Sequence, residues 1–96
     1  MNKTKYHEVN IRDVVVNWGE SLKIIRKKKR ITLVNLSQLT GVQCSSLSRM
    51  ENNKLTGSIK TYIAIANVLG FRLSEMFAMI EQMENRRISK ARYNHD

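Results

Sequence analysis

The 96-residue sequence predicts an all-α domain, and three observations support this class. Proline, which interrupts helices, is absent. Apolar residues recur at steps of three and four, as they do along one face of a helix. Residues that begin or end helices, among them Thr32, Gly41, Ser58 and Gly70, separate these apolar runs. We therefore predict five helices with short connections, in a chain long enough for one hydrophobic core.

The first helix is predicted over about residues 11–29. Its apolar face is formed by Ile11, Val14, Val15, Trp18, Leu22 and Ile25. A residue that can cap a helix, followed three positions later by a carboxylate, occurs at Asn17 and again at Asn10, so two starts are open. The β-branched run "DVVV" disfavours the earlier start without excluding it. We favour the earlier start, which leaves residues 1–10 as an N-terminal arm.

The second helix is predicted to be short. It covers Leu33 to Thr40, with Thr32 as its cap. Gly41 ends it, because a left-handed residue at this point costs glycine little. Leu36 and Leu39 are predicted to face inward.

The third helix is predicted to begin at Gln43 or Cys44. Leu47 and Met50 are three positions apart and mark its buried side. Serine usually favours caps and turns over helix interiors, yet this helix is rich in serine. The other side carries polar residues with little apolar surface to pack: Ser45, Ser48 and Arg49.

The fourth helix is predicted to begin after the cap Ser58 and to end at Gly70. Its buried stripe is predicted to be Ile59, Tyr62, Ile63, Ala66 and Leu69. The fifth helix begins near Leu73 or Ser74. Its apolar face is predicted to be Leu73, Met76, Phe77, Ile80 and Met83.

The chain after Met83, "ENRRISKARYNHD", is polar and basic. We predict that residues 84–96 form a frayed, flexible tail, as chain ends often do. The folded domain is then predicted to span residues 11–83.

The net charge of +9 at pH 7 is large for this length and unevenly placed. Residues 17–56 carry eight lysine and arginine side chains against two glutamates. A basic patch of this kind usually faces a polyanion, with nucleic acid first and an anionic membrane second. A membrane-surface helix would need exposed aromatics, whereas the first predicted helix is basic mainly at its end.

Other functional classes find little support in the sequence. The longest mostly apolar stretch, "YIAIANVLGF", is too short for a membrane span, and the N-terminus has no signal peptide pattern. His7 and His95 lie at opposite ends, and Cys44 is the only cysteine. We therefore expect a soluble, cytoplasmic protein that is not an enzyme and has no metal, cofactor or small-molecule ligand.

Four stretches in fixed order carry a resemblance to a known family: "WGESLKIIRKKK", "TLVNLSQLTGV", "SSLSRMENNK" and "SIKTYIAIANVLGFRLSEMF". From Trp18 to Phe77 the chain resembles the helix-turn-helix DNA-binding domain of the phage repressor and Cro type, also called the Xre type. The resemblance implies that the second and third helices form the helix-turn-helix motif. Ser37 then takes the close-contact position between them, and the third helix enters the DNA major groove.

By this resemblance, Cys44, Ser45 and Arg49 occupy positions that contact bases, with Ser48 adjacent. A guanidinium can pair with both O6 and N7 of guanine, although Arg49 could contact a phosphate instead. Family members often have glutamine or arginine where this chain has Cys44. A thiol reads bases poorly, so an apolar contact with a thymine methyl is expected there, and a redox role is an alternative.

The resemblance also implies the phosphate contacts. They are expected from Thr32, Leu33, Gln43, Ser46, Asn52, Asn53 and Lys54. The family usually has glutamine where this chain has Leu33, so backbone N–H groups must serve at that point. Lys27 to Arg30 are expected to flank the DNA while also suiting the negative end of a helix dipole.

Two further features follow from the resemblance. Arg26 and Glu51 match a buried ion pair that links the first helix to the recognition helix in this family. A homodimer is also implied, with an interface on the fifth helix formed by Met76, Phe77, Met79, Ile80 and Met83. The alternative is that these five residues all belong to the core of one chain.

The sequence thus predicts a sequence-specific regulator that binds a pseudo-palindromic double-stranded DNA operator as a homodimer. It could be a phage-type repressor, a regulator of a plasmid or other mobile element, or the controller of a restriction–modification operon. Activation is equally open, which makes RNA polymerase a candidate partner. The alternative is an antitoxin that binds a protein toxin and regulates its own operon.

Overall fold

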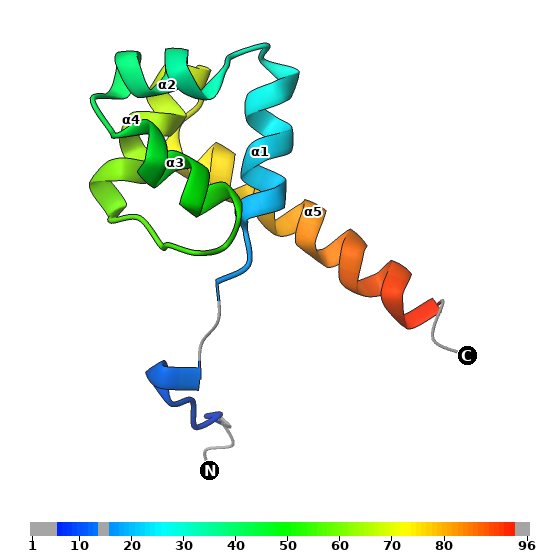
Figure 1. Cartoon of the computed structure of the whole chain (residues 1–96). Coiled ribbons are helices and arrows are strands. Elements are labelled where there is room, and N and C mark those ends of the chain that lie inside the picture. Colours follow the sequence, from blue (N-terminus) through cyan, green and yellow to red (C-terminus); the bar gives the residue numbers. More distant parts are fainter. Residues whose placement is uncertain (1–5, 14–15, 94–96) are drawn as a thin grey trace.

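The computed structural model describes residues 6–13 and 16–93, with side chains described as far as Ile88. Its elements are a short 3-10 helix η1 (Ile11–Asp13), followed by α1 (Gly19–Lys28), α2 (Leu33–Thr40), α3 (Cys44–Glu51), α4 (Ile59–Leu69) and α5 (Leu73–Tyr93). In Figure 1, α1 to α4 and the beginning of α5 form one body, from which the rest of α5 runs outward. Every regular element within these ranges is helical, so the predicted all-α class is confirmed.

The core lies where the five helices meet, and each helix contributes to it. Ile65 and Ala66 of α4 are 0% exposed, and Leu36 and Leu47 bring in α2 and α3 at 1% each. The remaining buried apolar residues are Leu22, Ile25, Met50, Tyr62, Leu69, Met76 and Ile80. Burial of these side chains is the main force that holds such short helices in place, because isolated helices of this length are marginal in water.

Local capping residues set the bounds of α2 and α4. The Thr32 hydroxyl accepts a hydrogen bond from the backbone N–H of Asn35 at 3.1 Å, and Gly41 takes a φ of +79° at the other end. Ser58 caps α4 in the same way, and Gly70 follows that helix with a φ of +85°. The predicted bounds of both helices are confirmed.

The predicted start of the first helix is wrong. The chain at Ile11 forms only the 3-10 helix η1, the Ile11 side chain is 85% exposed, and α1 begins at Gly19. Neither asparagine pattern caps it, because Trp18 is at the cap position. Val14 and Val15 lie outside the described residues. At Gly19 the chain passes directly over the end of α3, with no space for a Cβ atom.

Three predicted inward positions are also wrong. Leu39 is 65% exposed, Ile59 57% and Ile63 41%. In α4 the buried stripe runs through Tyr62, Ile65, Ala66 and Leu69, so Ile65 is buried where the spacing predicts Ile63.

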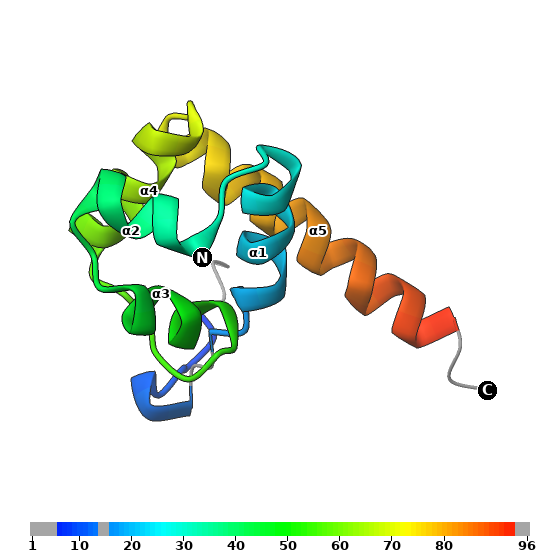
Figure 2. The same ribbon diagram turned by 45° about the horizontal axis from the view of Figure 1, so that its top comes forward.

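Residues 84–93, predicted as part of a frayed tail, are helical, and residues 94–96 lie outside the described residues. The helix α5 continues through Tyr93, and Figure 2 shows this part extending well beyond the other helices.

Within the described residues no single helix is long and apolar enough to span a membrane. Only α4 and Leu73–Ile88 together reach that length, and the two segments bend by 93° at their junction.

Candidate nucleic-acid interface

The turn between α2 and α3 is closed by a compact set of hydrogen bonds. The Ser37 hydroxyl donates to the carbonyl of Val42 at 2.6 Å, and the N–H of Gly41 donates to the carbonyl of Ser37 at 2.9 Å. The Thr40 hydroxyl donates to the carbonyl of Leu36 at 2.7 Å and accepts from the N–H of Val42 at 3.2 Å. These bonds close the turn that leads from α2 into α3, and Ser37 takes part in it through its hydroxyl and its carbonyl.

The helix α3 has two chemically different sides. Leu47, Met50 and Glu51 are buried against the body. Ser45 and Arg49 are exposed, and Cys44, Ser46 and Ser48 are half-buried. The four predicted base-contacting residues therefore retain accessible surface, and none of the four is fully buried. A helix with short hydroxyl side chains can approach another surface with its backbone, which is the shape that a major groove accepts.

An ion pair ties α3 to α1. The Arg26 Nε donates to Glu51 Oε2 at 2.6 Å, and Nη2 donates to Glu51 Oε1 at 3.0 Å. The pair is therefore bidentate. The Arg26 Nη1 also donates to the carbonyl of Ile31 at 2.7 Å. Both side chains are buried, so the predicted pair is confirmed.

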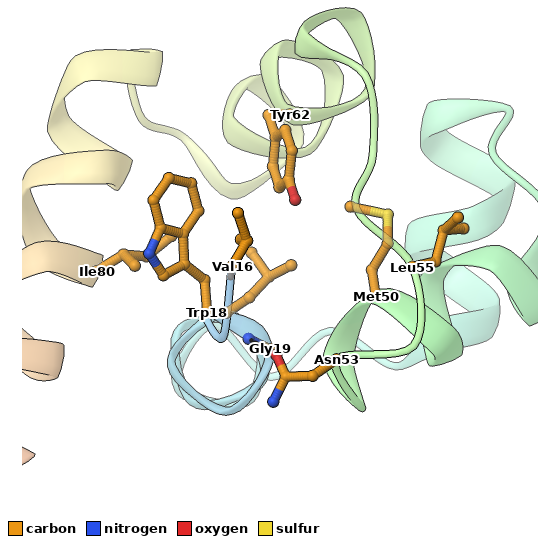
Figure 3. A pocket seen from close by; sticks show the side chains of 9 residues that line it. Val16, Trp18, Gly19, Met50, Asn53, Leu55, Tyr62 and Ile80 are labelled. Atoms are coloured by element: carbon orange, nitrogen blue, oxygen red, sulfur yellow. Dashed lines mark hydrogen bonds between the residues drawn. The ribbon is translucent and has the colours of Figure 1, made fainter. Parts of the chain in front are cut away.

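A second link joins the start of α1 to the residues after α3 (Figure 3). The Asn53 Oδ1 accepts a hydrogen bond from the N–H of Gly19 at 2.8 Å, and Asn53 has a φ of +60°. A Cβ atom on Gly19 would collide with the backbone carbonyls of Met50 and Glu51, so the two helices meet backbone to backbone. The cavity beside them is about 10 Å3, which leaves room for no ligand larger than water.

The predicted phosphate-contacting residues lie at the start of α2, at the start of α3 and directly after α3. Leu33 and Ser46 are half-buried, and the others are exposed: Thr32, Gln43, Asn52, Asn53 and Lys54. Some of their polar atoms already have partners. The Thr32 hydroxyl is engaged as the α2 cap, and the Asn52 Nδ2 donates to the carbonyl of Ser48 at 2.8 Å. Leu33 packs against the core, so its backbone is the part of it that can face outward.

The predicted dimer surface requires a correction. Met76 and Ile80 are 0% and 1% exposed within one chain, so they are core residues and offer no surface to a second copy. Phe77, Met79 and Met83 are half-buried and pack against the edge of the core. Phe77 belongs to an aromatic cluster with Trp18 and Tyr62, and its ring centroid is 5.1 Å from that of Trp18.

Two structural roles escaped the sequence analysis. Asn53 was assigned only to DNA, although asparagine tolerates left-handed backbone and its amide can close a helix start. The hydrogen bond from the Ser21 hydroxyl to Glu84 joins residues 63 positions apart. Such a distant pair leaves no periodic signal in a single sequence.

The comparisons with known proteins agree with this geometry. The helix-turn-helix family model HTH_3 matches residues 22–76, more than half of the chain. The solved structure of the clp gene regulator ClgR from Corynebacterium glutamicum is similar, with a TM-score of 0.76 over 82% of this chain and 84% of that chain. The two sequences are 18% identical, so this likeness shows the fold alone. A search of curated proteins found no match. The chain belongs to the Xre/Cro-type helix-turn-helix family and is a DNA-binding transcriptional regulator.

Proposed function

We propose that the protein binds a specific double-stranded DNA operator as a homodimer, with α3 of each copy in the major groove. The observation that carries this proposal is the two-sided character of α3. Its apolar residues Leu47 and Met50 are buried, whereas the opposite side exposes Ser45 and Arg49. Nothing within the described chain packs over that side, and the net charge of +9 favours a polyanionic partner.

Base recognition is assigned to Cys44, Ser45, Ser48 and Arg49. Arg49 is exposed and long enough to reach a base edge, where a guanidinium fits guanine O6 and N7. Ser45 and Ser48 supply hydroxyl groups that can donate or accept. The half-buried Cys44 at the first turn of α3 is assigned an apolar contact with a thymine methyl.

Phosphate contacts are assigned to residues at the ends of the two motif helices: Thr32, Leu33, Gln43, Ser46, Asn52, Asn53 and Lys54. The first turn of α3 supports this assignment, because its cap residue Gln43 makes no side-chain hydrogen bond to it. The N–H groups of that turn are therefore open to an external acceptor such as a phosphate oxygen. Thr32 and Leu33 would act through the backbone at the start of α2.

The dimer surface is assigned to α5, with Met76 and Ile80 removed from the predicted set. Met79 and Met83 line an open groove of about 360 Å3 together with Ile25 and Phe71. On the opposite flank of α5, Phe77 is half-buried and Ile88 is 52% exposed. The length of α5 beyond the body offers a second copy a surface that one small domain cannot cover by itself (Figure 1).

Selection of bound sequences from a random DNA pool tests this proposal directly. We expect a pseudo-palindromic site whose two half-sites are about one helical turn, roughly 34 Å, apart. The double variant Ser45→Ala, Arg49→Ala should fold normally, as judged by circular dichroism, and select no motif. A motif unchanged by both substitutions, or a single unpaired half-site, would contradict the proposal.

The proposal also includes a regulatory role. The described residues form one DNA-binding body and α5, and the proposed role is that of a repressor or of the controller of a compact operon. The structural neighbour ClgR is a regulator of clp genes, which is in keeping with this role. Transcription from a promoter carrying the selected site, with and without the protein, separates repression from activation.

A further inference from the structure

The Ser21 hydroxyl on α1 and the Glu84 carboxylate on α5 form a hydrogen bond between distant parts of the chain. Ser21 Oγ donates to Glu84 Oε2 at 2.6 Å, a length typical of a hydroxyl bonded to a charged carboxylate. Ser21 is 0% exposed, so its hydroxyl has no access to bulk water and depends on this acceptor.

Glu84 lies where α5 leaves the body of the protein. Met83 and Glu84 are half-buried, whereas all four residues from 85 to 88 are exposed. Figures 1 and 2 both show α5 continuing outward from this region without another helix beside it. Among the described side chains, Glu84 makes the last hydrogen bond that connects α5 to another helix.

The other partner, α1, is held firmly against the recognition helix. Arg26 bonds to Glu51 twice, and the N–H of Gly19 bonds to Asn53. Ser21 lies in α1 between these two attachments. One rigid helix therefore connects α3, which faces the DNA, with the point where α5 departs.

We propose that Ser21 and Glu84 are positioning residues that set the half-site spacing of the operator by fixing the direction of α5. This inference rests on the proposed function, in which a dimer forms through α5. The part of α5 from Glu84 to Tyr93 is a lever of roughly 13.5 Å, and a swing of about 15° moves its end by ~3.5 Å, close to the rise of one base pair. The contact acts on the distance between the two α3 helices and leaves each helix's own surface unchanged.

Four substitutions separate this role from general stabilisation. Ser21→Ala removes the donor without adding volume, and Glu84→Ala removes the acceptor. Glu84→Gln keeps an oxygen that can accept from Ser21 and removes the charge. Arg87→Ala breaks the ion pair of 3.4 Å between Arg87 Nη1 and Glu84 Oε2 while leaving the Ser21 contact.

The experiment measures the affinity of the full chain for four duplexes built from the site that the wild type selects. These are the selected operator, versions with the spacer one base pair longer or shorter, and a single half-site. For the wild type we expect each altered spacer to cost ~10-fold or more, because the second half-site can no longer be engaged without strain. For Ser21→Ala and Glu84→Ala we expect this ratio to fall below about threefold, with single half-site affinity unchanged.

Glu84→Gln and Arg87→Ala should both keep the wild-type spacing ratio. A Ser21→Ala protein with the wild-type ratio overturns the positioning role and leaves the proposed function intact. So does an equal loss of affinity on all four duplexes, since that result describes a contact that only stabilises the fold. A wild type that selects no paired half-sites overturns the dimeric function, and the positioning role with it.

Discussion

The carboxylate of Glu51 on the recognition helix accepts two hydrogen bonds from the guanidinium of Arg26 on α1, at 2.6 and 3.0 Å. Both side chains are buried, and the remaining Arg26 nitrogen donates to the carbonyl of Ile31. No hydrogen-bonding atom of the pair depends on water. The orientation of α3 is therefore set by a polar contact inside the domain as well as by the apolar side of the helix.

Removal of one partner of this ion pair should destabilise the domain strongly. In Glu51→Ala the Arg26 guanidinium stays buried without its countercharge, and we expect the free energy of unfolding to fall by about 3–5 kcal/mol. Urea denaturation followed by circular dichroism measures this. Glu20→Ala is the control, because Glu20 is an exposed glutamate at the start of α1. Equal stability of the two variants would mean that the pair contributes nothing.

The close approach at Gly19 predicts an unusual response to alanine. Alanine normally favours a helix over glycine by about 0.5–1 kcal/mol, but here its Cβ would collide with the backbone of Met50 and Glu51. We expect Gly19→Ala to cost about 1–3 kcal/mol in thermal or chemical unfolding. Gly57→Ala is the matched control, because the atom nearest to its Cβ is the flexible end of Met50. A Gly19→Ala variant as stable as the wild type would show that the two backbones separate freely.

Asn53 allows the capping bond and the backbone conformation to be measured separately. Asn53→Ala loses the bond to Gly19 and places alanine at a φ of +60°, so a loss of about 1–3 kcal/mol is expected. Asn53→Gly should recover the part due to backbone strain and leave the part due to the bond. Asn52→Ala is expected to stay near wild type, since its amide bonds only within α3. Unfolding curves for the three variants would expose any other order of stability.

Arg49 and Lys54 should affect DNA binding in different ways. Arg49→Ala is expected to lose about 1–3 kcal/mol of discrimination at one base pair of the operator and to relax selection there. Lys54→Ala should weaken binding to all sequences alike and lower the salt slope by about 1. Fluorescence anisotropy with operator and scrambled duplexes distinguishes the two effects. A uniform loss in Arg49→Ala would reassign that side chain to a phosphate.

Salt provides a test that needs no substitution. If the dimer makes roughly 6–10 phosphate contacts, affinity should fall by ~10³–10⁵ between 50 and 200 mM salt, because each contact releases condensed counterions. The logarithm of the affinity should be linear in the logarithm of the salt concentration. A flat response would be strong grounds against a phosphate-binding surface.

The parts of the fold that were predicted correctly depend on local chemistry. Thr32, Gly41, Ser58 and Gly70 fix the bounds of α2 and α4 through caps that involve only nearby residues. The ion pair between Arg26 and Glu51 was found because the family resemblance supplied it.

The incorrect predictions concern helix bounds and buried faces that depend on contacts between residues far apart in the sequence. The apolar residues before Trp18 imitate a helical face, yet α1 begins at Gly19, where the chain meets the end of α3. The polar composition after Met83 suggested fraying, although residues 84–93 contain no glycine or proline and several strong helix formers. Ile63 and Leu39 fit a three-and-four spacing as well as their buried neighbours do. Which of two nearby apolar residues faces the core depends on how the helices cross, and the spacing of apolar residues does not contain that information.

The hydrogen bond between Asn53 and Gly19 offers a way to detect DNA binding, if Asn53 contacts a phosphate as proposed. Its oxygen is committed to the N–H of Gly19, and among the described residues its nitrogen donates no hydrogen bond. If a phosphate oxygen accepted a hydrogen bond from the Asn53 Nδ2, the side chain would be held between the DNA and the N–H of Gly19. Deuterium uptake at the Gly19 amide should then slow when the complex forms, which converts a buried peptide proton into a gauge of operator occupancy.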